Sequence, residues 1–109
     1  MFNIDEKTGN INVSKGDCFM FCLSVFPYTA EETDTFTFII RDSNSSDGKL
    51  IFSKNFTGLT GTSPLLQFTT SEVQEVKEGS YYYEIYITSS DGNIFTRKSA
   101  KFIVGEVLH

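Results

Sequence analysis

Histidine is nearly absent from this sequence, and that absence limits the chemistry the chain can perform. The one histidine is the last of 109 residues, His109. Activating a serine or cysteine nucleophile needs a positioned base beside it, and no imidazole is available inside the chain. Carboxylate pairs occur at Glu31–Glu32, 72/75 and 42/47, but each falls in an expected loop or solvated face, where a raised carboxyl pKa is hard to maintain. We therefore expect no catalytic residues, no cofactor and no enzymatic activity.

Clusters of positive charge are also lacking. Nine Lys and Arg residues stand against fourteen Asp and Glu, which gives a formal net charge of −5. The basic residues are spread along the chain, with only Arg97 and Lys98 adjacent, whereas binding to nucleic acid or to an anionic membrane needs clustered cations. The charge pattern therefore argues against both partners.

Long hydrophobic runs are missing as well. The most apolar run, Cys18–Val25, is interrupted by Ser24 and is far shorter than the ~20 residues that span a bilayer. Residues 1–6 are acidic and lack a basic segment followed by an apolar stretch, so we expect no signal peptide. The sequence predicts a soluble protein that is not exported by the usual route.

Cysteine is scarce, with Cys18 and Cys22 alone. Four residues of extended strand separate them by ~13 Å, too far for a disulfide. We expect both to be reduced thiols buried in the core. With no internal histidine as a companion ligand, we expect no transition-metal site. The segment 42–48 resembles the start of a calcium loop, but Ser53 stands where the twelfth-position glutamate belongs, so we expect a plain hairpin loop.

Aromatic residues, in contrast, are plentiful, with 11 Phe and 5 Tyr, and they favour strands. Two β-rich runs, Thr35–Arg41 and Tyr81–Thr88, each lead into Ser-Ser-Asp-Gly and are followed by a further β-like run, at 49–56 and 93–104. Asp-Gly between such runs predicts a hairpin, because both residues tolerate the positive φ of tight turns. The sequence therefore predicts two β-hairpins.

The remaining pattern predicts one all-β domain over residues 1–109. Short strands are expected at 2–5, 11–14 and 65–70. The run Cys18–Phe26 is apolar on both faces and is expected to be a central strand covered on both sides or an inter-sheet strand. Ser71 and Gln74 match a helix capping box, which predicts a short helical crossover near 71–77. The side chains expected to face inward are Phe36, Phe38, Ile40, Leu50, Phe52, Phe56, Tyr81, Tyr83, Ile85 and Ile87.

About seven strands with regular turn signals indicate an immunoglobulin-like antiparallel β-sandwich. Residues 78–83 (EGSYYY) resemble the approach to strand F of such domains. Tyr81 is then expected to form the tyrosine corner, with its hydroxyl bonded to upstream backbone. Tyr83 takes the place of the second cysteine of the inter-sheet disulfide, with Cys18, Met20 or Cys22 as its counterpart. That disulfide is therefore absent, as is expected in a reducing compartment.

An interaction surface is expected on the outward face of the strand that begins at Tyr81. Tyr82 and Tyr86 share that face, and Phe95 is expected beside them across the hairpin. Aromatic side chains in this arrangement fit a subunit interface or cross-strand packing. They also fit a platform on which a sugar or peptide stacks.

Several segments together resemble a family of small prophage proteins of Gram-positive bacteria, similar to the amino-terminal domain of phage baseplate upper proteins. The matching segments cover nearly the whole chain and are 11–17 (INVSKGD), 34–38 (DTFTF), 50–54 (LIFSK), 79–85 (GSYYYEI), 91–96 (DGNIFT) and 102–107 (FIVGEV). The resemblance implies an immunoglobulin-like β-sandwich without an active site. It carries over no individual functional residue.

This resemblance implies a structural role in the assembly of a phage tail or baseplate. The expected partners are other tail or baseplate proteins and further copies of the chain. The expected location is the bacterial cytoplasm, where the chain is made, and the virion tail once assembled. The alternative is a carbohydrate- or peptide-binding β-sandwich module that uses the Tyr82/Tyr86 face.

Overall fold

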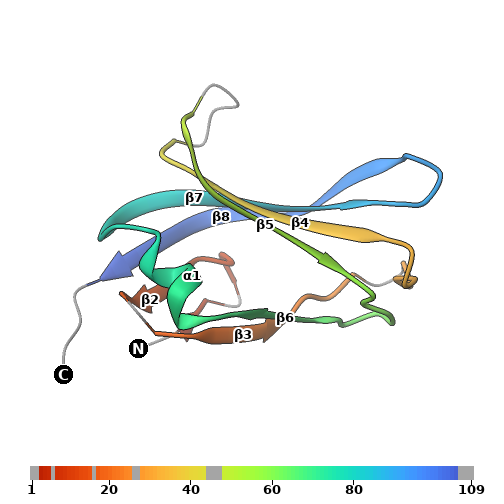
Figure 1. Cartoon of the computed structure of the whole chain (residues 1–109), viewed down its shortest axis with the longest axis horizontal. Helices are drawn as coiled ribbons and strands as arrows, with labels where there is room; N and C mark the ends of the chain where they lie inside the picture. Colours follow the sequence, from red (N-terminus) through yellow and green to blue (C-terminus); the bar gives the residue numbers. More distant parts are fainter. Residues whose placement is uncertain (1–2, 6, 16, 26–27, 44–47, 106–109) are drawn as a thin grey trace.

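The computed structural model describes residues 3–5, 7–15, 17–25, 28–43 and 48–105, with the side chains of 95–98 left out of the description. Two β-layers face each other across one core (Figure 1). The elements are β1 (Asn3–Ile4), β2 (Ile11–Ser14), β3 (Phe19–Cys22), β4 (Thr35–Arg41), β5 (Leu50–Thr57), β6 (Leu65–Phe68), α1 (Thr70–Gln74), β7 (Gly79–Thr88) and β8 (Ile94–Gly105).

The two layers have an immunoglobulin-like strand order. In the described residues the large sheet runs β1-β2-β8-β7-β4-β5, and the small sheet is β3-β6. In the immunoglobulin plan, β3 and β6 correspond to strands B and E of one layer. Strands β4, β5, β7 and β8 correspond to strands C, C′, F and G of the other layer. The expected all-β sandwich is confirmed. One detail differs, because β2 pairs parallel to β8, so the large sheet is mixed rather than purely antiparallel.

Both expected hairpins form, β4 with β5 and β7 with β8. The tip at Asp47 lies outside the described residues. In the second tip, the Gly92 amide donates to the Ser89 carbonyl at 2.9 Å, and Gly92 has φ +89°. No described residue other than glycine has a positive φ, so Asp91 does not share the left-handed conformation of Gly92. The tip is a turn closed by one left-handed glycine.

Alternation of side chains fills the space between the layers. Phe36, Phe38 and Ile40 of β4 are at most 1% exposed, as expected. Phe68 of β6 is central to the packing, with ring centroids 4.4 Å from Phe19 and 4.7 Å from Phe38. Such aromatic pairs stabilise a core beyond the apolar area that they bury.

Leu50 departs from this pattern, because it is 50% exposed rather than inward-facing. The cause is a register shift between β4 and β5: Ile40 pairs with Phe52, but Arg41 pairs with Leu50. Ile51 is therefore an extra residue on β5, and Leu50 loses the inward position that a regular alternation gives it.

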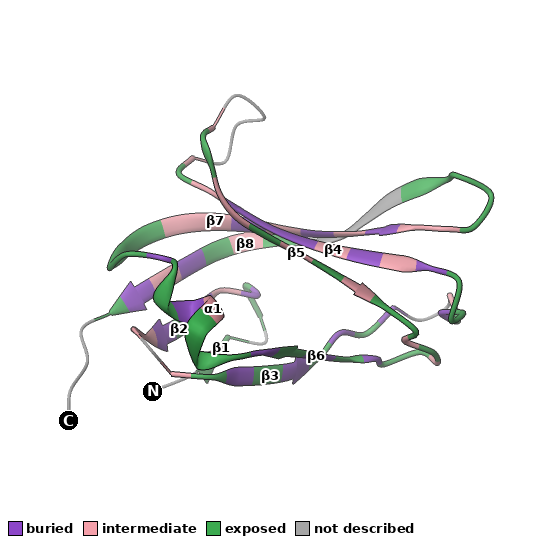
Figure 2. Cartoon of the chain, in the orientation of Figure 1, coloured by how far each residue is buried: buried purple, intermediate pink, exposed green. Residues whose placement is uncertain are grey.

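The cysteines are also placed differently from the expectation. Cys18 and Cys22 are free thiols, and both are exposed. On β3 the inward side chains are Phe19 and Phe21, so the period of two turns Cys18, Met20 and Cys22 outward. Figure 2 shows this alternation as bands along β3. The segment is therefore covered on one face only, and none of the three outward residues is the inter-sheet counterpart of Tyr83.

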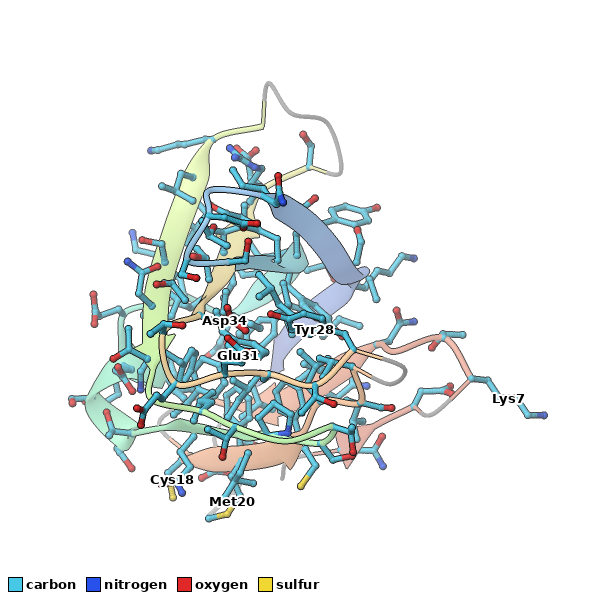
Figure 3. The ribbon with its side chains drawn as sticks, turned by 90° about the vertical axis from the view of Figure 1, so that its right-hand side faces the viewer. Lys7, Cys18, Met20, Tyr28, Glu31 and Asp34 are labelled. Carbon is cyan, nitrogen blue, oxygen red and sulfur yellow. The ribbon has the colours of Figure 1, made fainter. Side chains whose placement is uncertain are left out.

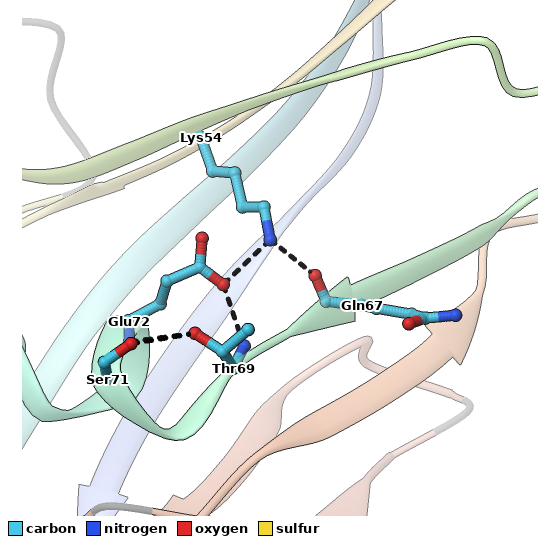
Figure 4. Close-up of polar contacts among 5 residues, drawn as sticks. All are labelled: Lys54, Gln67, Thr69, Ser71 and Glu72. Carbon is cyan, nitrogen blue, oxygen red and sulfur yellow. Dashed lines mark hydrogen bonds and ion pairs between the residues drawn. The ribbon is translucent and has the colours of Figure 1, made fainter.

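Helix α1 begins two residues earlier than the sequence pattern indicated. Thr69, not Ser71, is the N-cap: its side chain accepts from the Glu72 amide, and the Glu72 carboxylate accepts from the Thr69 amide. The overlapping segment Thr69–Glu72 fits the same capping box. Glu72 is held further by Lys54 of β5, whose ammonium donates to it and to the Gln67 carbonyl, each at 2.8 Å (Figure 4).

Candidate functional site

The outward face of the large sheet carries the tyrosines that the sequence singled out. Tyr82 and Tyr86 are half-buried on β7, on the side opposite the fully buried Tyr83, Ile85 and Ile87. Four residues of strand separate the two phenol rings by ~13 Å along β7. They therefore belong to one face, with Glu84 between them.

Ile39 adds an apolar side chain to this face. It lies on β4 opposite Glu84, and is 7% exposed although it is not part of the core between the sheets. Tyr82 and Tyr86 are its diagonal neighbours, within reach of long side chains. We call Ile39, Tyr82 and Tyr86 the outer-face cluster. The sequence pattern singled out the two tyrosines but not Ile39.

Charged residues of both signs border the outer-face cluster. Tyr82 pairs across the sheet with Arg41 on β4 and with Lys101 on β8, and Glu84 lies opposite Ile39, between the two tyrosines. The Arg41 guanidinium donates to the Gly48 carbonyl at 3.2 Å. Aromatic and apolar side chains with charged and polar residues beside them are a common composition of a protein interface.

Phe95, the third residue expected here, has a different position in the register. β8 contains an extra residue, Arg97, between the pairs Ile85–Lys98 and Tyr86–Thr96. Phe95 pairs with Ile87 rather than with Tyr86, and its side chain lies outside the described residues.

Tyr81 has the geometry of a tyrosine corner. Its hydroxyl donates to the carbonyl of Lys77, four residues upstream, at 2.7 Å. Its ring also lies 3.5–3.6 Å from the position that a Cβ on Gly79 would take, and Gly79 has φ +150°. This bond ties the start of β7 to the end of the helical crossover, so Tyr81 has a structural role.

A second surface, a depression of about 300 Å³, lies at one end of the sandwich. Its walls are the loop before β4 and the tip between β7 and β8. We call it the acidic end pocket, and Figure 3 shows three of its residues drawn together. The lining residues are Tyr28, Glu31, Asp34, Ser89, Ser90, Asp91 and Asn93.

Asp34 forms the floor of this pocket and is 1% exposed. Its Oδ2 accepts a short hydrogen bond from the Tyr28 hydroxyl, and a second from the Glu31 amide at 3.0 Å. These bonds satisfy a buried carboxylate that otherwise costs several kcal/mol. The hydrogen bond to Asp34, together with burial and nearby carboxylates, raises the pKa of Tyr28 to about 12.

The tip on the opposite wall is organised by Asp91. Its carboxylate accepts from the Ser89 hydroxyl, the Asn93 amide and the Asn93 side chain. The hydrogen bond from Ser89 and that from the Asn93 backbone hold the pKa of Asp91 below its usual range. Asp91 therefore keeps its negative charge at neutral pH. Among the described residues, no three His, Cys, Asp or Glu side chains lie close enough together to hold a metal ion.

Sequence reasoning missed the acidic end pocket, because it took the acidic loop 29–34 as solvated. The pocket depends on β4 lying beside β7, with Thr35 paired to Thr88, which sets Asp34 next to Ser89. Which strands lie side by side in the sheet cannot be predicted from composition or from the spacing of residues.

Comparisons with known proteins add little to this picture. No protein-family model and no curated protein matches the chain. Among solved structures, one of murine CRIg is similar over 97% of this chain and 98% of that chain, at 14% sequence identity and a TM-score of 0.42. A likeness this distant carries no argument. The class of protein, an immunoglobulin-like β-sandwich, follows from the strand order itself. Among the described residues, no helix is long and apolar enough to cross a membrane.

Proposed function

We propose that this chain is a non-enzymatic assembly module of a phage tail or baseplate, encoded by a prophage. It is made in the bacterial cytoplasm and incorporated into the virion tail, where it contacts other tail proteins and further copies of itself. The tail or baseplate setting is supported by the sequence resemblance. The assembly role is supported by the surface of the folded chain.

The observation that carries the assembly role is the outer-face cluster. Ile39 is almost fully buried on a sheet face that no other layer of the described structure covers, and two tyrosines stand diagonally beside it. Tyrosine is enriched among the residues that dominate binding energy, particularly near the centre of an interface. A neighbouring protein docked on this face would desolvate both tyrosines, while Arg41 and Lys101 at the rim would steer its approach.

The test is binding to the tail and baseplate proteins encoded in the same prophage, purified singly and measured by calorimetry. Tyr82→Ala combined with Tyr86→Ala is expected to weaken binding by at least about tenfold, as removal of interface tyrosines does. Tyr28→Ala removes a tyrosine from the acidic end pocket and serves as the matched control, and its affinity is expected to be unchanged. An undiminished affinity in the double variant would remove the outer face from the proposal, and no binding to any tail protein would contradict the assembly role.

The alternative function is a carbohydrate- or peptide-binding module, and the same pair of tyrosines favours it. Phenol rings ~13 Å apart on a strand offer stacking surfaces for a sugar chain or an extended peptide. A glycan array probed with the labelled chain distinguishes the two functions. Binding that is lost in Tyr82→Ala supports the alternative, and an array without signal contradicts its carbohydrate form.

A further inference from the structure

The small sheet leaves one strand edge unpaired. β3 pairs with β6 on one side, and no strand in the described part of the chain pairs with its other side. Figure 1 shows these two strands forming a layer of their own. An edge of this kind presents a row of N–H and C=O groups to any strand that approaches.

Backbone hydrogen bonds show which residues face the open edge. The Leu23 amide donates to the Pro64 carbonyl and the Val25 amide to the Thr62 carbonyl, both on the β6 side. Backbone groups of successive strand residues point to opposite sides. The N–H and C=O of Met20 and Cys22 therefore point away from β6, to the open edge.

The open edge lacks two common protections against pairing, a charged side chain and a proline. Residues 18–25 contain no charged residue and no proline, whereas natural edges are usually guarded by one or the other. Met20, at the centre of this edge, has a side chain that is 56% exposed. Leu65 on β6 adds a 37% exposed apolar side chain to the same outer face. Figure 3 shows Cys18 and Met20 projecting away from the body of the molecule.

The sequence of the edge is symmetric about Met20. Residues 18–22 read Cys-Phe-Met-Phe-Cys in both directions. A two-fold axis through Met20 would set the strand antiparallel to its own copy, with Met20 opposite Met20 and Cys18 opposite Cys22 of the second copy. Every pair would then be matched in size and polarity, as a two-fold contact between identical surfaces requires. With no charge on the strand, no like-charge repulsion opposes this contact.

We propose that the chain dimerises by antiparallel pairing of β3 with β3 of a second copy, about an axis at Met20. The proposal deepens the self-association that the assembly role includes, and rests on that role. It joins the two small sheets into one continuous sheet. The outer-face clusters stay free for other tail proteins.

Cysteine positions make this register measurable. Met20 and Cys22 point their backbone groups to the new partner, so facing residues would be hydrogen-bonded pairs with α-carbons about 5.5 Å apart. A disulfide needs 4.4–6.8 Å. Cys18 of one copy can therefore form a disulfide with Cys22 of the other copy. Cys18 and Cys22 of the same chain are ~13 Å apart and cannot.

The experiment is mild oxidation with diamide, followed by non-reducing electrophoresis. Each disulfide releases two protons and two electrons, which reduce the azo bond of diamide to a hydrazine. Cys18→Ser and Cys22→Ser are expected to give at least about tenfold less covalent dimer than the unmodified chain, because identical positions lie too far apart across the axis. An equimolar mixture of the two variants is expected to restore the dimer, since one chain supplies Cys22 and the other Cys18.

A second measurement does not depend on thiols. Light scattering of the reduced chain is expected to give the mass of a dimer. Met20→Lys places two ammonium groups opposite each other at the axis and is expected to give a monomer. Leu50→Lys is the matched control, because Leu50 is a similarly exposed apolar residue on β5, and it is expected to remain dimeric.

The proposal is overturned if the single-cysteine variants cross-link as well as their mixture, or if the reduced chain is monomeric at every concentration. A dimer that survives Met20→Lys would also overturn it and would direct the search to another surface. These outcomes leave the assembly role itself to be judged by the tail-protein measurement with Tyr82 and Tyr86, so the two failures can be told apart.

Discussion

Single hydroxyl groups fix several contacts that burial alone would leave undefined. Tyr83 is 1% exposed, and its hydroxyl donates to the carbonyl of Gly9, 74 residues away in sequence. The bond ties the turn between β1 and β2 to the centre of the large sheet. Burial raises the pKa of this phenol, which keeps it protonated and able to donate.

We predict that Tyr83→Phe lowers the free energy of unfolding by about 1–3 kcal/mol, because it leaves the buried Gly9 carbonyl without its donor. Urea unfolding followed by circular dichroism measures the change. Tyr86→Phe, on the half-buried outer face, is the control and is expected to change stability by less than about 0.5 kcal/mol. Equal effects in the two variants would contradict a special role for the Tyr83 hydroxyl.

Tyr28 provides a prediction for alkaline pH. Its pKa is about 12 in the folded chain, above the ordinary value of 10.0, so folding favours the protonated phenol. Its contribution to stability is therefore complete below pH 10 and is lost as the pH rises from 10 towards 12. The difference in unfolding free energy between the unmodified chain and Tyr28→Phe is expected to shrink over that window. A difference that stays constant to pH 12 would show that the Asp34 contact does not hold the phenol proton.

Specific residues set where the strands and the helix of this fold begin and end, in addition to the alternation of inward and outward side chains. The β7–β8 hairpin turns at one left-handed residue, Gly92, with φ +89°. Helix α1, five residues long, is held by a complete capping box at Thr69 and Glu72. A helix this short is marginal by itself, so its cap and its contact with β5 decide where it begins.

Gly92→Ala is expected to cost about 1 kcal/mol, since an L-residue in the left-handed region is strained. No atom lies within 4 Å of the added Cβ, so crowding contributes nothing. Gly105→Ala serves as the control, because it likewise has open space but no positive φ. Thermal unfolding of both variants measures the difference; a Gly92 variant as stable as the control would contradict the turn geometry.

Across the whole molecule, Lys54 links the two layers on the β5 side. Its ammonium reaches the Gln67 carbonyl of β6 and the Glu72 carboxylate of α1, and it lies 4.9 Å from the Phe56 ring centroid and 5.3 Å from that of Phe68. Burial acts to raise the pKa of Glu72, but the hydrogen bonds from Lys54 and Thr69 outweigh it, and the pKa is lowered below 4.5. The pair therefore stabilises the contact between the sheets most at neutral pH.

Lys54→Met keeps the apolar stem but removes the charge, and we predict a loss of about 1 kcal/mol near pH 7 for this partly exposed pair. A lowered carboxyl pKa contributes stability above pH 4.5, and this contribution is lost as the pH falls through the folded-state value. The difference in unfolding free energy between the variant and the unmodified chain should therefore decrease below pH 4.5. Urea unfolding at several pH values measures this difference. A difference that does not change with pH would show that the Lys54 contribution to stability does not depend on ionised Glu72.

The sequence by itself determined the β class, both hairpins, the inward faces of β4 and β7, and the tyrosine corner at Tyr81. These features depend on alternation and turn chemistry, which are local. It also placed Tyr82 and Tyr86 on one outward face, because the period of two along a strand needs no knowledge of neighbours.

Only the tertiary structure decided which strands are neighbours, and with it the exposure of Cys18 and Cys22, the outward turn of Leu50 and the acidic end pocket. The two cysteines sit in a segment that is apolar on both faces, and the sequence cannot tell which face has a partner layer. Leu50 depends on one extra residue in β5, and the pocket on the pairing of Thr35 with Thr88. Each of these is set by long-range pairing, whose free energy depends on the packing of the assembled sheets rather than on the local residues.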